Sequence, residues 1–270
     1  MTLSVRELVG IRLNAKDPRV TAEFFVTSLG FTRHSSGDGA ESLTLGPSRL
    51  EIARASGAPY PAAVPAWSPL FQHFAIATHD VGAAYSRLRQ TGGWTPISTD
   101  GPQRLPPSSG GVTAFKFRSP EGHPLELISA EAGEVPRIDH SAISVTNTEA
   151  SVAFYDALGL RCGAVSCNHG PEQARLDGLA GAEVDVTGLF APRGATHLEL
   201  LAYRAERTGA QTPPALSDVA ATRLVFTAVA PAIEALRRRS DLEWSGSSAV
   251  LRDPDGHLLQ LELKRPPGGP

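Results

Sequence analysis

The sequence has few of the features that mark secreted, membrane-bound or nucleic-acid-binding proteins. It contains only two cysteines, Cys162 and Cys167, among 270 residues, whereas disulfide-stabilised secreted chains usually carry a larger even set. No apolar run is long enough for a signal peptide or a membrane span. The formal net charge is -3, whereas phosphate binding requires clustered Lys and Arg. We therefore expect a cytoplasmic protein that binds neither nucleic acid nor membrane.

The sequence does contain internal repeats, which decide the predicted architecture. Residues 118–127 (RSPEGHPLEL) match residues 252–261 (RDPDGHLLQL). In both segments a Pro and Gly turn leads into a strand of alternating apolar residues. Each half of the chain therefore ends in a hairpin and a terminal strand.

A second repeat opens each half, where residues 11–31 resemble residues 142–160. An apolar strand leads through Asp17 or Asn147, both good helix starters, into an amphipathic helix that ends at Gly. Weaker copies of this strand and helix pattern occupy residues 71–92 and 223–239.

These repeats predict an α+β fold of four βαβββ modules, with helices on one face of curved sheets and the concave faces free for a ligand. The modules span residues 6–56, 69–130, 136–205 and 219–265. We expect an N-terminal domain at 1–130, a C-terminal domain at 136–265, and a disordered tail at 266–270.

The motifs resemble the vicinal-oxygen-chelate superfamily, which includes glyoxalase I, methylmalonyl-CoA epimerase, extradiol dioxygenases and the bleomycin resistance proteins. The carriers are residues 138–145 (IDHSAISV), the Phe154 and Tyr155 pair, and the two Gly-His turns. Together they cover nearly the whole chain. The resemblance implies two glyoxalase-like pockets of paired modules, in which each module offers one metal ligand from its first strand and one from its last.

On that basis only the two middle modules offer complete ligand pairs. These are His73 with Glu126, and His140 with Glu199; the outer modules offer Gly10 with Glu51, and Arg223 with Gln260. Strand alternation supports the inner set, because it turns His73 away from Phe74 and each carboxylate away from two flanking leucines. A carboxylate buried there is costly unless it is paired, neutralised or bound to a cation.

The order in which modules pair decides whether the four ligands meet. Pairing in chain order leaves each pocket with an incomplete set, whereas pairing of the middle modules brings all four ligands into one pocket. We favour the second arrangement, because random loss would not readily leave four ligands in adjacent modules. Two imidazoles and two carboxylates suit one divalent metal ion, with Fe, Zn, Ni, Co and Mn all compatible.

Three functions stay open at this point. The first is a metal-dependent isomerase, epimerase or lyase that stabilises an enediolate, with Glu126 or Glu199 as general base. The second is ring-cleaving oxygenation of a catechol-like substrate, although the extradiol pattern expects ligands in modules three and four. The third is a small-molecule-binding protein without chemistry, although aromatic residues make up only 6% of the chain. In each case we expect a monomer or a homodimer.

A polar segment at residues 167–176 is the candidate for contacting the substrate. We interpret it as a loop that either closes over the pocket or forms a surface hairpin. In the first case it would hold an oxygen-rich substrate, through side chains among Asn168, His169, Gln173 and Arg175. His123 and His257 lie in the repeated turns, for which we expect a structural role.

Overall fold

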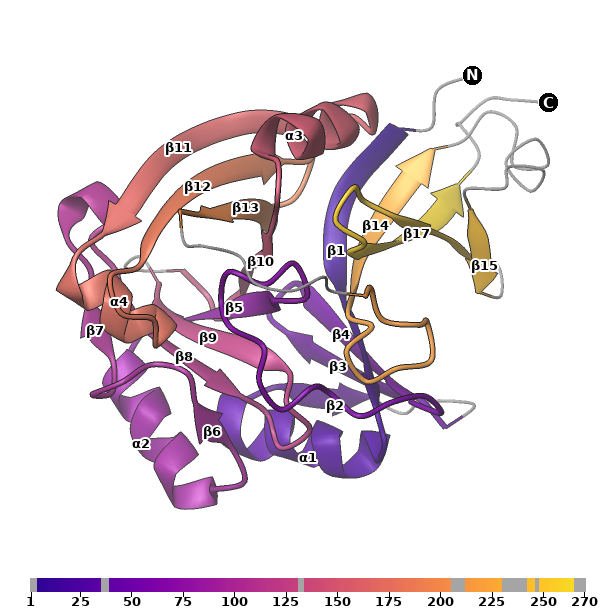
Figure 1. Ribbon diagram of the computed structural model, residues 1–270. Helices are drawn as coiled ribbons and strands as arrows, with labels where there is room; N and C mark the ends of the chain where they lie inside the picture. Colours follow the sequence, from indigo (N-terminus) through magenta and orange to yellow (C-terminus); the bar gives the residue numbers. More distant parts are fainter. Residues whose placement is uncertain are drawn as a thin grey trace.

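The computed structural model describes residues 4–34, 39–130, 134–204, 212–229, 242–245 and 248–264. In these ranges the helices and strands follow the predicted module order (Figure 1). The described helices are α1 (Pro18–Leu29), α2 (Val81–Thr91), α3 (Thr148–Ala157), α4 (Pro171–Asp177) and the short 3-10 helix η1 (Pro107–Ser109). The helix expected within residues 230–239 and the tail at 266–270 lie outside the described residues.

The two middle modules form one nine-stranded sheet, which we call the inner sheet. Its central strands belong to different modules and run antiparallel. Along the sheet the strands are β11 (Arg161–His169), β12 (Glu183–Phe190), β13 (His197–Tyr203), β10 (Arg137–Ser144), β5 (Gln72–Thr78), β9 (Pro124–Ser129), β8 (Thr113–Arg118) and β6 (Thr95–Pro96), with β7 (Gln103–Arg104) paired to β8.

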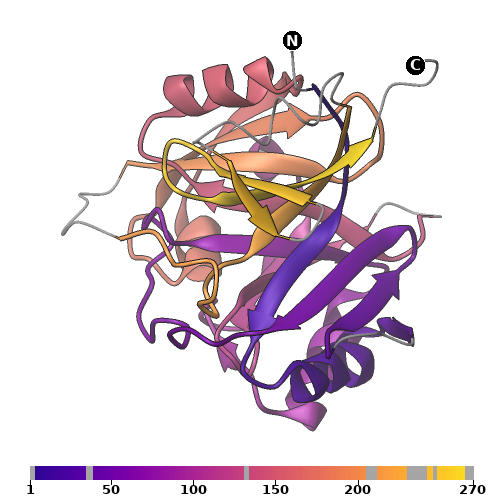
Figure 2. The same cartoon turned by 90° about the vertical axis from the view of Figure 1, so that its right-hand side faces the viewer.

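The first and last modules form the outer sheet, which has eight strands. Figure 2 shows this sheet toward the viewer, with indigo β1 at its centre. In order the strands are β15 (Glu243–Ser245), β16 (Ser248–Arg252), β17 (Leu258–Lys264), β14 (Arg223–Val229), β1 (Ser4–Ala15), β4 (Ser48–Arg54), β3 (Glu41–Leu45) and β2 (Thr32–His34). The modules therefore pair as two with three and one with four, which confirms the favoured arrangement.

The predicted helix starts are present in the structure. The Asp17 side chain accepts hydrogen bonds from the first-turn amides of α1, and Asn147 accepts one from the Ala150 amide at 3.0 Å. The first helix ends at Gly30, whose φ of 77° is a conformation that favours glycine. These caps fix the helices so that their apolar faces cover the sheets.

One apolar core joins α1, α2 and α3 to both sheets. Phe25 of α1 stacks on Phe74 of β5 with ring centroids 6.1 Å apart, so the first two modules share this core. The alternate residues of β5 and its neighbours point to the opposite, concave side. Core packing on one face thus presents polar side chains on the other.

The two Gly-His turns connect modules that are consecutive in the chain, as their expected structural role requires. His123 Nε2 lies 2.9 Å from the Asn14 carbonyl oxygen, and His257 Nε2 lies 3.0 Å from that of Ser144. Burial is the main cause that lowers the pKa of His123. Each histidine ties a terminal hairpin to the first strand of the preceding module.

Candidate metal centre

Four side chains converge from the central strands of the inner sheet. His73 lies on β5, Glu126 on β9, His140 on β10 and Glu199 on β13. Glu126 is the register partner of Ala75, and Glu199 that of Ala142, so each glutamate lies beside the residue two positions after a histidine. The middle modules therefore place their histidine and glutamate pairs at equivalent positions.

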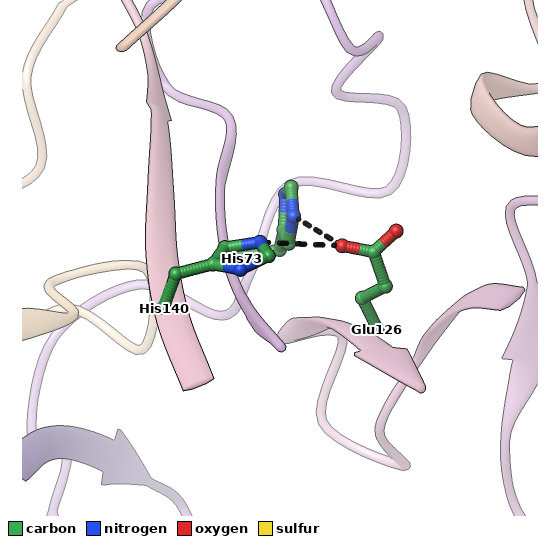
Figure 3. A group of neighbouring side chains, drawn as sticks. All are labelled: His73, Glu126 and His140. Carbon is green, nitrogen blue, oxygen red and sulfur yellow. Dashed lines mark hydrogen bonds and ion pairs between the residues drawn. The ribbon is translucent and has the colours of Figure 1, made fainter. Parts of the chain in front are cut away.

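The atoms of these side chains lie within a few ångströms of one another. Glu126 Oε2 is 3.0 Å from His73 Nε2 and 3.5 Å from His140 Nε2 (Figure 3). Glu199 Oε2 is 3.6 Å from the same His140 Nε2. His73, Glu126 and His140 are buried, and the Glu199 side chain is 24% exposed. Glu199 is thus the more accessible carboxylate.

Ion pairing leaves two negative charges at this centre. The carboxylate of Asp177 is paired with Lys116 at 2.6 Å, and Asp139 is paired with Arg137 at 2.6 Å. No Lys or Arg within the described ranges forms an ion pair with either ligand glutamate. Their combined charge matches that of one divalent cation.

When no cation is bound, the two histidines differ in how readily they take up a proton to balance the carboxylate charge. Burial opposes protonation of His140, but Glu199, Asp139 and Glu126 together raise its pKa well above the ordinary value. For His73, burial and the charge of Lys116 lower the pKa. Protonated His140 therefore supplies positive charge beside the carboxylates, as a bound metal ion would.

The carboxylates are held ionised by the same neighbours. Burial alone would raise the pKa of Glu126, but the charge of Lys116 and the close contacts with His140 and His73 hold it well below its usual value. Burial also opposes ionisation of Glu199, whose pKa is lowered chiefly by His140. Both groups are thus in the form that binds metals.

The donor atoms fit a divalent cation. His140 Nε2 is buried and makes no hydrogen bond of good geometry, although two carboxylate oxygens lie near it. One ligand atom from each of His73, Glu126 and His140 lies within 4.8 Å of the others. Such an unsatisfied buried nitrogen beside two carboxylates is what a shared metal ion would complete. A set of imidazole and carboxylate donors is compatible with Fe, Zn, Ni, Co or Mn.

Two functional neighbours were missed in the sequence. Asp139 Oδ2 lies 3.1 Å from His140 Nδ1 and orients the ring so that Nε2 faces the centre. His197 Nε2 lies 3.4 Å from Glu199 Oε1, and Phe190 stacks on its ring at 4.8 Å. Strand alternation could have found His197, because it precedes Glu199 by two residues on the same face.

A cavity of about 280 Å³ adjoins the centre. Of the predicted substrate-contacting residues, Asn168 and Gln173 line it, whereas His169 and Arg175 do not. His169 is exposed, and Arg175 donates to Gln103 Oε1 at 2.7 Å. The structure therefore brings only half of that polar set to the cavity.

The predicted loop at residues 167–176 was wrong, because the segment is regular. Its first residues complete β11, and the rest form α4. Pro171 opens this helix and Gly178 ends it with a φ of 59°, both of which are usual signals for helix ends. The helix turns Gln173 and Leu176 toward the cavity.

A buried ion pair lies beside the cavity, which Lys116 lines. Lys116 of β8 and Asp177 of α4 have side-chain exposures of 5% and 0%. Burial alone would lower the pKa of Lys116, but Asp177 and Glu126 raise it, which keeps the ammonium charged. Gln173 Nε2 also donates to Asp177 at 2.7 Å, which leaves its buried Oε1 without a partner within the described ranges.

A sequence model of the Glyoxalase/Bleomycin resistance protein/Dioxygenase superfamily matches residues 7–127 and 137–261. The chain belongs to this superfamily. The superfamily includes enzymes as different as glyoxalase I and dioxygenases. No curated protein matches the chain. None of the described helices is long and apolar enough to cross a membrane.

Two solved structures share the fold over nearly the whole chain. A glutamate-to-glutamine mutant of glyoxalase I from Zea mays aligns with a TM-score of 0.65 at 19% identity, covering 97% of this chain and 94% of that one. A provisionally named dioxygenase from Bacillus subtilis aligns with a TM-score of 0.55 at 12% identity, covering 98% and 87%. At such identities the similarity establishes the fold alone.

Proposed function

We propose that this chain is a divalent-metal-dependent enzyme that acts on a small oxygenated substrate by enediolate chemistry, as an isomerase, epimerase or lyase. The observation that carries the proposal is the convergence of His73, Glu126, His140 and Glu199 with two unbalanced negative charges. A bound divalent ion would polarise adjacent oxygens of the substrate and stabilise negative charge that develops on them.

The two glutamates suit different roles. Glu126 is buried between both histidines, so its main task is to hold the metal. Glu199 is more exposed and hydrogen-bonds His197, so it is the better general base for removing a proton from carbon. Burial opposes its ionisation, but the charge of His140 lowers its pKa in the metal-free protein, and a bound divalent cation would replace that charge, so Glu199 would be ionised near neutrality and able to accept a proton.

The cavity wall supports a compact substrate with a hydroxyl group. The unpartnered Oε1 of Gln173 is an acceptor, and the neighbouring Tyr203 hydroxyl makes no hydrogen bond of good geometry within the described ranges. Val184, Val186 and Leu201 give the same cavity apolar surface. A hydroxyl that donates to Gln173 while the rest of the molecule contacts the valines fits this combination.

Metal content tests the first part of the proposal. Untagged wild type and His73→Ala, Glu126→Gln and His140→Ala variants are reconstituted with each candidate metal and analysed by elemental mass spectrometry. Wild type should hold about one ion and each variant should lose it, because removal of one ligand weakens a site of this kind strongly. The control is His34→Ala, an exposed histidine of the outer sheet. A metal-free wild type after reconstitution would favour the binding-protein alternative.

Proton exchange tests the chemistry. The metal-loaded protein is incubated with a panel of α-hydroxycarbonyl compounds in D2O, and loss of the carbon-bound proton signal is followed by NMR. We expect Glu199→Gln to retain bound metal and to lose exchange by about 100-fold or more, since positioned general bases contribute that much. Metal binding without exchange for any compound would contradict enediolate chemistry.

One observation supports ring-cleaving oxygenation as a second candidate. His73, Glu126 and His140 alone form a group of two histidines and one carboxylate, the donor set of non-haem iron oxygenases. Oxygen uptake by the Fe(II)-loaded protein with a panel of catechols tests it. The fourth donor, Glu199, favours the first proposal, because it occupies a position that an oxygenase would leave open.

A further inference from the structure

The outer sheet has a different set of side chains at the positions that correspond to the metal centre. Gln260 is the register partner of Val225, two residues after Arg223, and Glu51 lies opposite the residue two after Gly10. These are the positions that the histidine and glutamate pairs occupy in the inner sheet. The outer set contains no histidine, and it places Arg223 on β14, a central strand of the outer sheet.

A second arginine lies directly opposite this one. Arg12 of β1 is the antiparallel register partner of Arg223 of β14, so both side chains are on the same face. Like charges placed opposite each other across a sheet destabilise the pair. The arrangement therefore needs negative charge close by.

The carboxylates on this face are already engaged with other arginines. Glu51 pairs with Arg12 at 3.0 Å, and Glu262 makes two contacts of 2.9 Å to Arg49. Arg223 has only neutral acceptors within the described ranges, the side chain of Gln260 at 3.3 Å and the carbonyl of Leu216 at 3.1 Å. Glu51 and Glu262 thus balance two of these three arginines, and Arg223 is left without an ion pair in the described ranges.

This uncompensated charge is buried. Arg223 is 5% exposed, and its Nε and that of Arg12 are buried without a hydrogen-bond partner in the described part of the chain. Burial and the charge of Arg12 lower the pKa of Arg223 to about 10. The charges of Glu243 and Glu51 act on the pKa of Arg223 in the opposite direction, and Arg252, which lies 3.9 Å from Glu243, lowers it. An isolated buried cation is strongly unfavourable unless an anion accompanies it.

We propose that the concave face of the outer sheet binds a small oxyanion between Arg12 and Arg223. The ligand class is a carboxylate or a phosphate, whose oxygens accept from both free Nε–H groups and complete the guanidinium contacts. The surplus of one positive charge favours a single carboxylate. Entry is from the side of Arg12 and Glu51, whose side chains are 26% and 36% exposed. This site is separate from the metal centre and independent of its chemistry.

Titration of the full chain with simple oxyanions tests the proposal. Acetate, benzoate and inorganic phosphate are titrated by calorimetry, and thermal unfolding is followed with the same anions against chloride at equal ionic strength. One anion should bind at one site and raise the melting temperature by about 5 °C at a hundredfold excess over Kd. The arm that binds most tightly distinguishes a carboxylate from a phosphate ligand.

Matched variants locate the binding. Arg223→Met and Arg12→Gln should each weaken anion binding by about tenfold or more, because a charge-assisted hydrogen bond is lost. Arg104→Gln, which removes an exposed arginine of β7 in the inner sheet, should change it by less than about twofold. Arg223→Met should also unfold at the same or a higher temperature than wild type without anion, since the uncompensated charge is gone.

The result that overturns the proposal is absence of saturable binding for all three anions, or binding that Arg223→Met leaves unchanged. Loss of the metal centre by His140→Ala should leave anion binding intact. If both variants of the arginine pair fail to fold, the anion-dependent rise in the wild-type melting temperature relative to chloride still decides the outcome.

Discussion

Removing Lys116 should affect stability and metal affinity in opposite directions. The ammonium lies 2.6 Å from Asp177, and the two side chains are almost completely buried. Lys116→Met leaves the Asp177 charge buried, with the Gln173 amide still donating to it. Loss of one member of a buried ion pair costs about 3–5 kcal/mol, so the melting temperature should fall by roughly 10 °C for a chain of this size. Urea unfolding of the metal-free protein measures this loss.

The same substitution removes a positive charge beside the metal centre. Lys116 is the antiparallel register partner of Glu126, and its charge acts on both Glu126 and His73. Without it, a divalent cation should bind more tightly, which a competition titration against a chromophoric chelator measures. A packing defect alone would not tighten metal binding, so lower stability together with higher metal affinity would identify the loss of the Lys116 charge as the cause.

Two controls separate this reasoning from a general packing effect. Lys116→Met with Asp177→Leu removes both charges and should recover most of the lost stability, because paired removal of a buried ion pair is often close to neutral. Arg104→Met removes an exposed cation from neighbouring β7 and should change neither quantity. A double variant as unstable as the single one, or a weaker metal affinity in Lys116→Met, would refute the argument.

Two further predictions follow from the two sheets. The raised pKa of His140 stabilises the metal-free fold fully below about pH 6.5. This contribution should fall by up to about 1.4 kcal/mol per pH unit as the pH rises through the folded-state pKa. The difference in unfolding free energy between wild type and His140→Gln, measured in urea, should therefore shrink as the pH rises. A difference that grows with pH would contradict this prediction. Replacement of Gly10 by His should not create a second metal site, because an added Cβ would collide with the Arg49 carbonyl oxygen; elemental analysis should still find one ion and unfolding should occur at lower temperature.

The repeats made most of the fold predictable. Helix caps such as Asp17 act locally, and strand alternation depends only on residue order, so both could be read from the sequence. The ligand positions followed because each module pairs its own first and last strands. The order of the modules in the sheets was left as two alternatives, because it depends on contacts between strands such as β5 and β10 that are distant in the chain.

The neighbours of the centre were harder to predict. Lys116 and Asp177 are 61 residues apart and meet only because α4 packs against β8. Asp139 stands next to His140 in the sequence, but adjacent strand residues normally face opposite sides. A register irregularity between Ile138 and His140 accompanies their contact, and no local pattern announces it.

The pairing of modules also explains how the two sheets could acquire different chemistry within one chain. Each concave face takes one ligand pair from each half of the chain, so changes in modules one and four alter only the outer face. Simple loss of a metal centre would be satisfied by small or apolar residues at Gly10 and Arg223. An arginine there is costly when buried without a counter-charge, and a second arginine opposite increases that cost. The outer face is therefore better explained as a site with its own anionic ligand than as a remnant of a metal centre.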